Sequence, residues 1–178
     1  MFPIIAVIGT SGSGKTTLIE YLISHLSKEG LRIGTIKHVH HPGFSIDAKG
    51  KDTWRHSQAG AKIVVCAAPN EIAIIKKRDA SSKHEMERII NLVKDEELDL
   101  LIIEGFHSII AKKQDIFKII TTNDEEDLRQ KLADTEDPIL AITGLITKQK
   151  NVALGIEIPL IDIDRNGKEI IKLVKDIL

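Results

Sequence analysis

Short apolar runs alternate along the chain with segments whose apolar residues recur at helical spacing. Residues 4–8 (IIAVI) form a short continuous run, which is typical of a strand buried on both faces of a sheet. From residue 16 to residue 29 the apolar side chains fall on one face of a helix, and Gly30 follows in the position of a C-terminal cap. Residues 31–37 (LRIGTIK) predict a second strand. A strand, loop, helix and strand in this order predict an α/β fold with a mostly parallel sheet flanked by helices.

The rest of the chain continues this alternation, with one antiparallel exception. Residues 62–67 and 71–77 are rich in strand-forming residues and are separated only by the segment APN, so they predict a β-hairpin inserted beside the parallel sheet. The other predicted strands are 98–103, 115–121, 138–143 and 158–161, and the other predicted helices are 52–59, 82–94, 123–132 and 166–178. Because no repeat or linker interrupts the pattern, we expect one domain spanning residues 1–178.

Composition excludes several classes of protein. The 25 basic and 26 acidic residues give a net charge of −1, so neither nucleic acid nor an anionic membrane is an expected partner. No stretch approaches the roughly 20 apolar residues of a membrane span, and the N-terminal run lacks the basic flank of a signal peptide, so we expect a cytoplasmic protein. The single cysteine, Cys66, excludes an intramolecular disulfide and is expected to be buried and inert in its apolar run.

The loop after the first strand carries the strongest chemical signal. Residues 9–16 read GTSGSGKT, which matches the phosphate-binding pattern G-x-x-x-x-G-K-[ST] between a strand and a helix. Its glycines allow backbone N–H groups to point inward at an anion, and the following helix directs its positive end to the same place. Lys15 is expected to meet the β- and γ-phosphates, and the Thr16 hydroxyl to bind Mg²⁺. The motif predicts a P-loop NTPase fold whose phosphate cradle consists of Gly9, Thr10, Ser11, Gly12, Ser13, Gly14, Lys15 and Thr16.

A P-loop site also needs a carboxylate near the magnesium, usually at the end of a neighbouring strand. Glu104 ends the apolar run LDLLII and is the best candidate for this role, in the Walker B manner. Most such sites use aspartate, so a contact through water is favoured over direct ligation. The alternative is an acidic residue at a strand end that faces solvent.

The loop that follows the second predicted strand is rich in histidines, lysines and carboxylates. Lys37, His38 and His41 belong to the segment KHVHH, and two interpretations are open: a transition-metal site, or contacts to phosphate or substrate. The second is favoured because no cysteine or carboxylate lies within the cluster. Further along, Asp47 is a candidate to position magnesium or a water molecule, and a solvated surface is the alternative. Asp52 is a second candidate for this role, and Lys51 or Arg55 could contact an anionic ligand. Trp54 is expected to pack the short helix.

The residues alone leave the base of the nucleotide open. GTP-specific proteins usually carry an N/T-K-x-D segment after a late strand, and this chain has none. Asn123 or Asp124 can accept hydrogen bonds from the N1 and N2 groups of a guanine. The favoured role for these residues is an N-terminal cap of the following helix.

Several segments together resemble one family. The segments GTSGSGKTTLIEYLI, GTIKHVHH, GKDTWRHSQAGA and LDLLIIEGF follow one another as in the MobB family of molybdopterin-guanine dinucleotide biosynthesis proteins. The resemblance covers residues 4–105 and is weaker beyond. It implies a GTP-binding accessory protein of molybdenum cofactor biosynthesis with weak, Mg²⁺-dependent GTPase activity. It also implies a homodimer that assists a MobA-like molybdopterin guanylyltransferase and contacts molybdopterin. By the same resemblance, Thr17 joins the phosphate site, and Lys37, His38 and His41 contact a ligand or partner.

Two other functions fit a small P-loop chain. An ATP-dependent small-molecule kinase usually has an arginine-bearing lid, and although Arg129 and Arg165 are present, no arginine-dense segment is visible. A metallochaperone GTPase is suggested by the histidines, but the lone Cys66 provides no thiolate cluster. If the chain is a GTP-binding accessory protein, we expect slow GTP hydrolysis, since no residue is clearly placed as an arginine finger.

Overall fold

The computed structural model describes residues 2–41, 43–77, 85–149 and 157–178. The chain divides into two compact units. The first contains Met1–His38 and Met86–Leu178, and the second contains Val39–Glu85. The expectation of one domain stays a prediction, because compactness does not show whether the two units fold independently.

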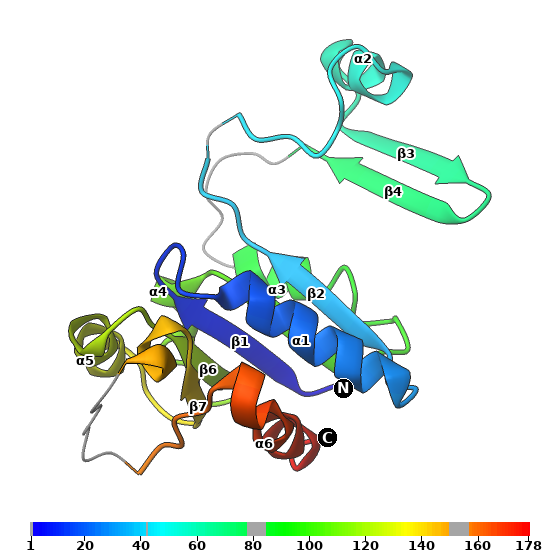
Figure 1. Ribbon diagram of the computed structural model, residues 1–178. Coiled ribbons are helices and arrows are strands. Elements are labelled where there is room, and N and C mark those ends of the chain that lie inside the picture. Colours follow the sequence, from blue (N-terminus) through cyan, green and yellow to red (C-terminus); the bar gives the residue numbers. More distant parts are fainter. Residues whose placement is uncertain (1, 42, 78–84, 150–156) are drawn as a thin grey trace. The chain divides into compact units, whose positions relative to one another are not determined.

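The first unit is built on a five-stranded parallel sheet (Figure 1). Its strands are β1 (Ile4–Gly9), β2 (Ile33–Lys37), β5 (Leu100–Glu104), β6 (Phe117–Thr121) and β7 (Ile139–Thr143), in the order β2-β5-β1-β6-β7. The strand that leads into the phosphate motif, β1, therefore lies between β5 and β6. This arrangement confirms the predicted mostly parallel α/β fold.

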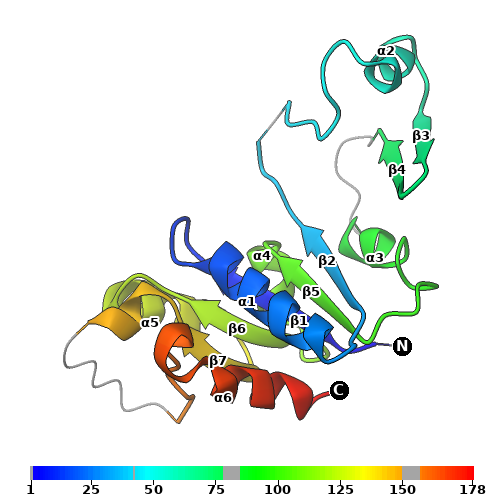
Figure 2. The same ribbon diagram turned by 45° about the vertical axis from the view of Figure 1, so that its right-hand side comes forward.

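Helices cover both faces of this sheet, which explains the continuous apolar runs of its central strands (Figure 2). On one face, α1 (Lys15–Lys28) and α6 (Ile163–Lys175) pack on alternate strand residues such as Val7 and Ile102. On the other face, α3 (Glu85–Ile90) and α4 (His107–Ile110) contribute to a core that includes Ile8 and Ile103. Helix α5 (Glu125–Asp134) packs with β6 and β7 in a smaller cluster.

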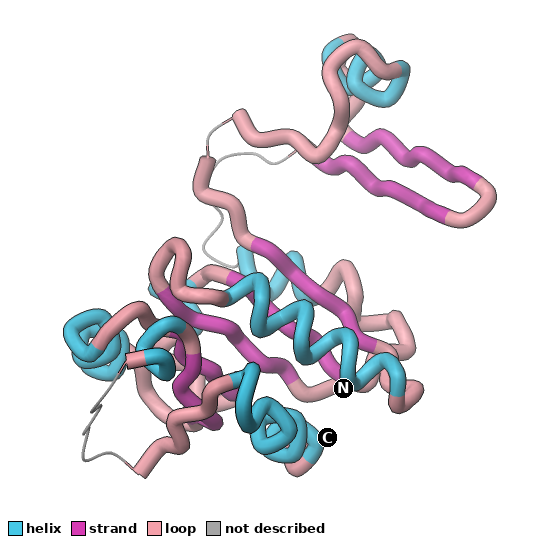
Figure 3. Tube along the Cα trace, in the orientation of Figure 1, coloured by secondary structure: helices cyan, strands magenta, loops and turns pink. Residues whose placement is uncertain are grey.

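The second unit contains α2 (Asp52–Gln58) and a hairpin of β3 (Ile63–Ala68) and β4 (Glu71–Lys76) (Figure 3). The antiparallel hairpin is confirmed, and it forms a two-stranded sheet of its own instead of joining the parallel sheet. Cys66 is exposed, so its predicted burial is wrong. Apolar neighbours along a strand bury a thiol only when another layer covers that face, and Val64 is the one residue of β3 that is buried.

Other predictions differ at element ends. The short strand at 158–161 is reduced to a single bridge between Ile142 and Leu160. Helix α6 begins earlier than predicted, because Asp162 caps it by accepting from the Asp164 N–H, and a kink at Asn166 interrupts it. Residues 82–84 of the predicted helix 82–94 lie outside the described residues, and its described part ends at Ile90. Helix α4 and the 3₁₀ helix Leu145–Lys148 were not predicted. No helix in the described part of the chain is long and apolar enough to cross a bilayer.

Candidate nucleotide-binding site

The predicted phosphate loop lies at the carboxyl end of β1, between that strand and α1 (Figure 1). Gly12 and Gly14 have φ of 77° and 100°, which is the left-handed region that favours glycine. A Cβ added to Gly9 would lie 2.2 Å from both the carbonyl oxygen and the hydroxyl oxygen of Thr121. The loop therefore needs its glycines, and it leads straight into a 14-residue helix whose first turn holds no acidic residue. This arrangement suits an anion.

Lys15 folds back onto the loop. Its Nζ donates to the carbonyl oxygens of Gly9 at 2.9 Å and Thr10 at 2.5 Å. The side chain is half-buried. A partly desolvated ammonium group needs acceptors, and the loop carbonyls supply them where a phosphate would otherwise do so. Burial lowers the pKa of Lys15, and the negative charge of Glu104 opposes that shift.

Glu104 lies at the end of β5, with β1 on one side and β2 on the other. It stands opposite Val7 of β1 and Lys37 of β2 in the strand register. Its side chain is 14% exposed, and both of its carboxylate oxygens accept from Lys37 Nζ at 3.1 Å. The predicted ligand contact Lys37 is thus the ion-pair partner of the predicted magnesium carboxylate. Thr16 and Thr17 lie in the exposed first turn of α1.

His38 continues this cluster within the first unit. Its backbone N–H donates to the Glu104 carbonyl oxygen at 2.9 Å, and its ring stacks on Phe106 with centroids 4.0 Å apart. Between them, Gly105 has a φ of 96°, and a Cβ there would lie 2.9 Å from the His38 Cβ. The segment EGF therefore combines a carboxylate, a close approach to His38 and a buried aromatic platform for its ring.

Two predicted site residues, His41 and Asp47, belong to the second unit. Asp47 Oδ1 accepts from Thr53 Oγ1 at 2.9 Å, and the Asp47 N–H donates to Ser45 Oγ at 3.1 Å. The first contact joins the loop before α2 to the first turn of that helix, and the second lies within the loop. The roles of His41 and Asp47 at the nucleotide site stay predictions. Across residues 2–41, 43–77, 85–149 and 157–178, no group of three or more potential metal ligands gathers.

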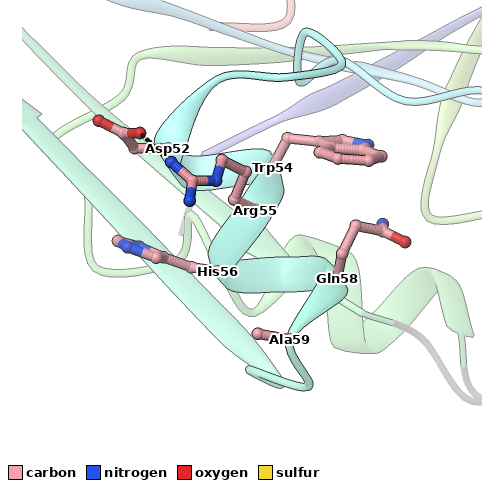
Figure 4. Close-up of a pocket in the computed structure, with 6 residues that line it drawn as sticks. All are labelled: Asp52, Trp54, Arg55, His56, Gln58 and Ala59. Atoms are coloured by element: carbon pink, nitrogen blue, oxygen red, sulfur yellow. Dashed lines mark ion pairs between the residues drawn. The ribbon is translucent and has the colours of Figure 1, made fainter.

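A pocket in the second unit lies against the surface of α2 (Figure 4). Asp52 and Arg55 form an ion pair at 3.6 Å, and with His56 they lie on one side of the helix. Trp54 and Gln58 point to the other side. Trp54 is half-buried, and its role in packing the helix stays a prediction.

Residues from the side of β6 and α5 also hold the loop, a role that the sequence pattern did not predict for them. Thr10 Oγ1 donates to Asp127 Oδ2 at 2.8 Å and accepts from Asn123 Nδ2 at 3.1 Å. Ser13 Oγ lies 2.6 Å from Thr121 Oγ1. Asp124 accepts from the Asp127 N–H at 2.9 Å, which confirms its role as the cap of α5. Partners so distant in sequence leave no local pattern from which they can be found.

Comparison with known proteins identifies the family. Residues 4–143 match the family model described as "Molybdopterin guanine dinucleotide synthesis protein B". The chain belongs to this family. The match includes the phosphate loop, the histidine loop and Glu104, which are the segments on which the resemblance was based.

Curated relatives support this membership along most of the chain. The "Molybdopterin-guanine dinucleotide biosynthesis adapter protein" of Escherichia coli is 29% identical over 164 residues, covering 92% of this chain and 87% of the relative. The protein of the same name from Haemophilus influenzae is 32% identical over 163 residues, covering 92% and 83%. The crystal structure of Bacillus subtilis MobB has a TM-score of 0.72 at 29% identity, covering 99% of this chain and 98% of that one.

Proposed function

We propose that this member of the family binds GTP and Mg²⁺ at its phosphate loop and acts as an accessory protein in molybdopterin guanine dinucleotide synthesis. The observation that carries the proposal is the convergence of the loop, Lys15 and Glu104 at the carboxyl ends of β1 and β5. In parallel α/β sheets, this edge is where nucleotides bind. The base is assigned to guanine from the family's description, since the residues themselves leave it open.

Different residues of the site bind the phosphates and the magnesium ion in this proposal. Backbone N–H groups of the loop from Gly9 to Gly14 hold the phosphate oxygens, and Lys15 exchanges its loop carbonyls for the β- and γ-phosphates. Thr16 and Glu104 hold Mg²⁺, which when bound neutralises charge on the phosphates. Because Glu104 is a glutamate that is already engaged by Lys37, its contact to the metal runs through water.

Hydrolysis by the isolated chain is slow in this proposal. Arg129 pairs with Glu125 at 3.5 Å and Arg165 with Asp162 at 3.6 Å, so both guanidinium groups have partners away from the loop. An arginine that stabilises the transferring phosphoryl group accelerates GTP hydrolysis by roughly 10³- to 10⁵-fold. If a partner protein supplied this arginine, the rate of GTP hydrolysis would depend on the two proteins being bound to each other. The same pairing weighs against a kinase with an arginine-bearing lid.

The hairpin of the second unit supports a homodimer. The register places Val65 opposite Ile74 and Ala67 opposite Ile72, so these residues share one face of the two-stranded sheet with Ile63. The four large apolar side chains on this face, at positions 63, 65, 72 and 74, are each more than half exposed. A contiguous apolar face of this kind marks an interface, and a twofold dimer pairs such a face with its own copy. Sedimentation of wild type and Val65→Glu tests this, and an unchanged mass would contradict it.

The proposed role is tested by reconstitution with a molybdopterin guanylyltransferase. The protein and GTP are added to the transferase and molybdopterin, and formation of the guanine dinucleotide is measured. We expect the protein to raise the yield or rate, and Lys15→Ala to raise neither, because binding of the nucleotide is required. Equal stimulation by both proteins would show that nucleotide binding at this loop plays no part in the role.

A further inference from the structure

The phosphate loop is held in place by a group of side chains that come from outside the loop. Thr10, the first residue after Gly9, is the point where they meet. Its hydroxyl donates to Asp127 Oδ2 at 2.8 Å and accepts from Asn123 Nδ2 at 3.1 Å. The same Asp127 oxygen accepts from the Asn123 backbone N–H at 3.0 Å.

The backbone of Thr10 carries the second half of this connection. Its carbonyl oxygen accepts from Lys15 Nζ at 2.5 Å and from Ser13 Oγ at 2.9 Å. A change at the Thr10 side chain would therefore move the Thr10 carbonyl oxygen, which accepts from the Lys15 ammonium group of the site. Burial lowers the pKa of Lys15, and the negative charge of Asp127 is one of the smaller influences that oppose this shift.

The elements that supply these groups are themselves fixed. The Asp127 N–H donates to Asp124 Oδ1 at 2.9 Å within the first turn of α5, and Leu128 in the next position is fully buried. The Asn123 carbonyl oxygen accepts from Gln149 Nε2 at 3.1 Å. The carboxylate is thus presented from a rigid helix rather than from a free surface loop.

We propose that Asp127 and Asn123 are positioning residues of the phosphate cradle, acting through the Thr10 side chain to hold the loop in its binding conformation. The proposal rests on the proposed nucleotide binding. It also assigns the Asn123 amide to the loop, where it donates to Thr10, rather than to recognition of a base. Their contribution is to pre-organise the loop, which reduces the ordering that binding would otherwise require.

The test compares four variants by calorimetric titration with GTP and Mg²⁺. Asp127→Ala removes the acceptor and Asp127→Asn keeps one, whereas Thr10→Val removes the hydroxyl at nearly constant shape. Glu126→Ala is the matched control, since it removes a charge from the same turn and Glu126 accepts from Gln130 Nε2 within α5. We expect Asp127→Ala and Thr10→Val each to weaken GTP binding about tenfold, as for the loss of one charge-assisted hydrogen bond. Asp127→Asn is expected to recover most of the loss, and the control to bind like wild type.

The pair Thr10→Val and Asp127→Ala also forms a double-mutant cycle. If Asp127 acts through Thr10, the double variant binds GTP no more weakly than the weaker single variant. Additive losses, or an Asp127→Ala variant that binds like the control, would overturn the proposal.

A second measurement keeps this result separate from the proposed function. Amide hydrogen exchange of residues 9–14 is followed in the nucleotide-free protein, with thermal unfolding measured in parallel. We expect these amides to exchange at least severalfold faster in Asp127→Ala than in Glu126→Ala. Failure of wild type to bind GTP would contradict the proposed function alone, whereas equal exchange in the two variants would contradict the positioning role whatever the nucleotide result.

Discussion

Lys37 donates to both carboxylate oxygens of Glu104 at 3.1 Å across neighbouring parallel strands. The pair places a cation on the carboxylate that a P-loop site uses near its metal. Lys37 is 58% exposed on its side chain, so it has room to move away, whereas Glu104 is largely enclosed. The proposed binding of magnesium would therefore compete with the ion pair for the same oxygens.

This competition is tested with Lys37→Gln. Without the ammonium group, the water that would link Mg²⁺ to Glu104 no longer competes with a cation for the carboxylate oxygens, so the gain in GTP affinity on adding Mg²⁺ is expected to rise severalfold. The measurement is the ratio of GTP dissociation constants in EDTA and in Mg²⁺. Lys113→Gln serves as the control, since it removes a lysine that pairs with Glu87 at 3.0 Å. A ratio equal to that of wild type would show that Lys37 and the metal do not share the carboxylate.

Lys15→Ala is expected to reduce triphosphate affinity by two orders of magnitude or more, because the point charge at the β- and γ-phosphates is lost. The variant also loses two donations to loop carbonyls, so its free energy of unfolding is expected to fall by about 1 kcal/mol. Calorimetry with GTP and urea unfolding measure the two effects. Wild-type affinity in this variant would show that the cradle has been assigned to the wrong loop.

Gly105→Ala tests the close approach behind Glu104. The new Cβ would lie 2.9 Å from the His38 Cβ at a backbone φ of 96°, so both contact and conformation oppose it. We expect a loss of about 2–3 kcal/mol in the free energy of unfolding. Gly30→Ala is the matched control, because Gly30 has a φ of 89° and nothing within 4 Å of an added Cβ. Its loss is expected to be about 1 kcal/mol, and equal losses in the two variants would rule out the contact with His38.

The pair of Lys148 and Asp162 gives stability a defined pH dependence. The hydrogen bond from Lys148 holds the pKa of Asp162 below its ordinary value of 3.8. A carboxylate with a depressed folded-state pKa adds stability above the unfolded value, and this contribution is lost as the pH falls through the folded value. Lys148→Met is therefore expected to be less stable than wild type at pH 7, with the difference shrinking below about pH 4. Urea unfolding at a series of pH values measures it, and a constant difference between pH 7 and pH 3 would contradict the assignment.

Local pattern was enough to predict the fold and to indicate the candidate site. The strand, loop and helix around Lys15 follow from apolar periodicity and glycine spacing, and Glu104 follows from its place after an apolar run. The contact between Thr10 and Asp127 joins residues 117 positions apart, and no local pattern encodes it. The four-residue helix α4 is too short to show a period. The predicted burial of Cys66 was wrong because a run of apolar residues indicates a strand without indicating whether another layer covers it.

The central claim is that the loop from Gly9 to Thr16 binds a guanine nucleotide with magnesium. Calorimetric titration of the wild-type chain with GTP and with ATP, each with Mg²⁺, tests it most directly. We predict saturable binding of GTP with a clear preference over ATP, and loss of that binding in Lys15→Ala. A preference for ATP would contradict the account and would favour the kinase, to be pursued with small metabolites as phosphoryl acceptors.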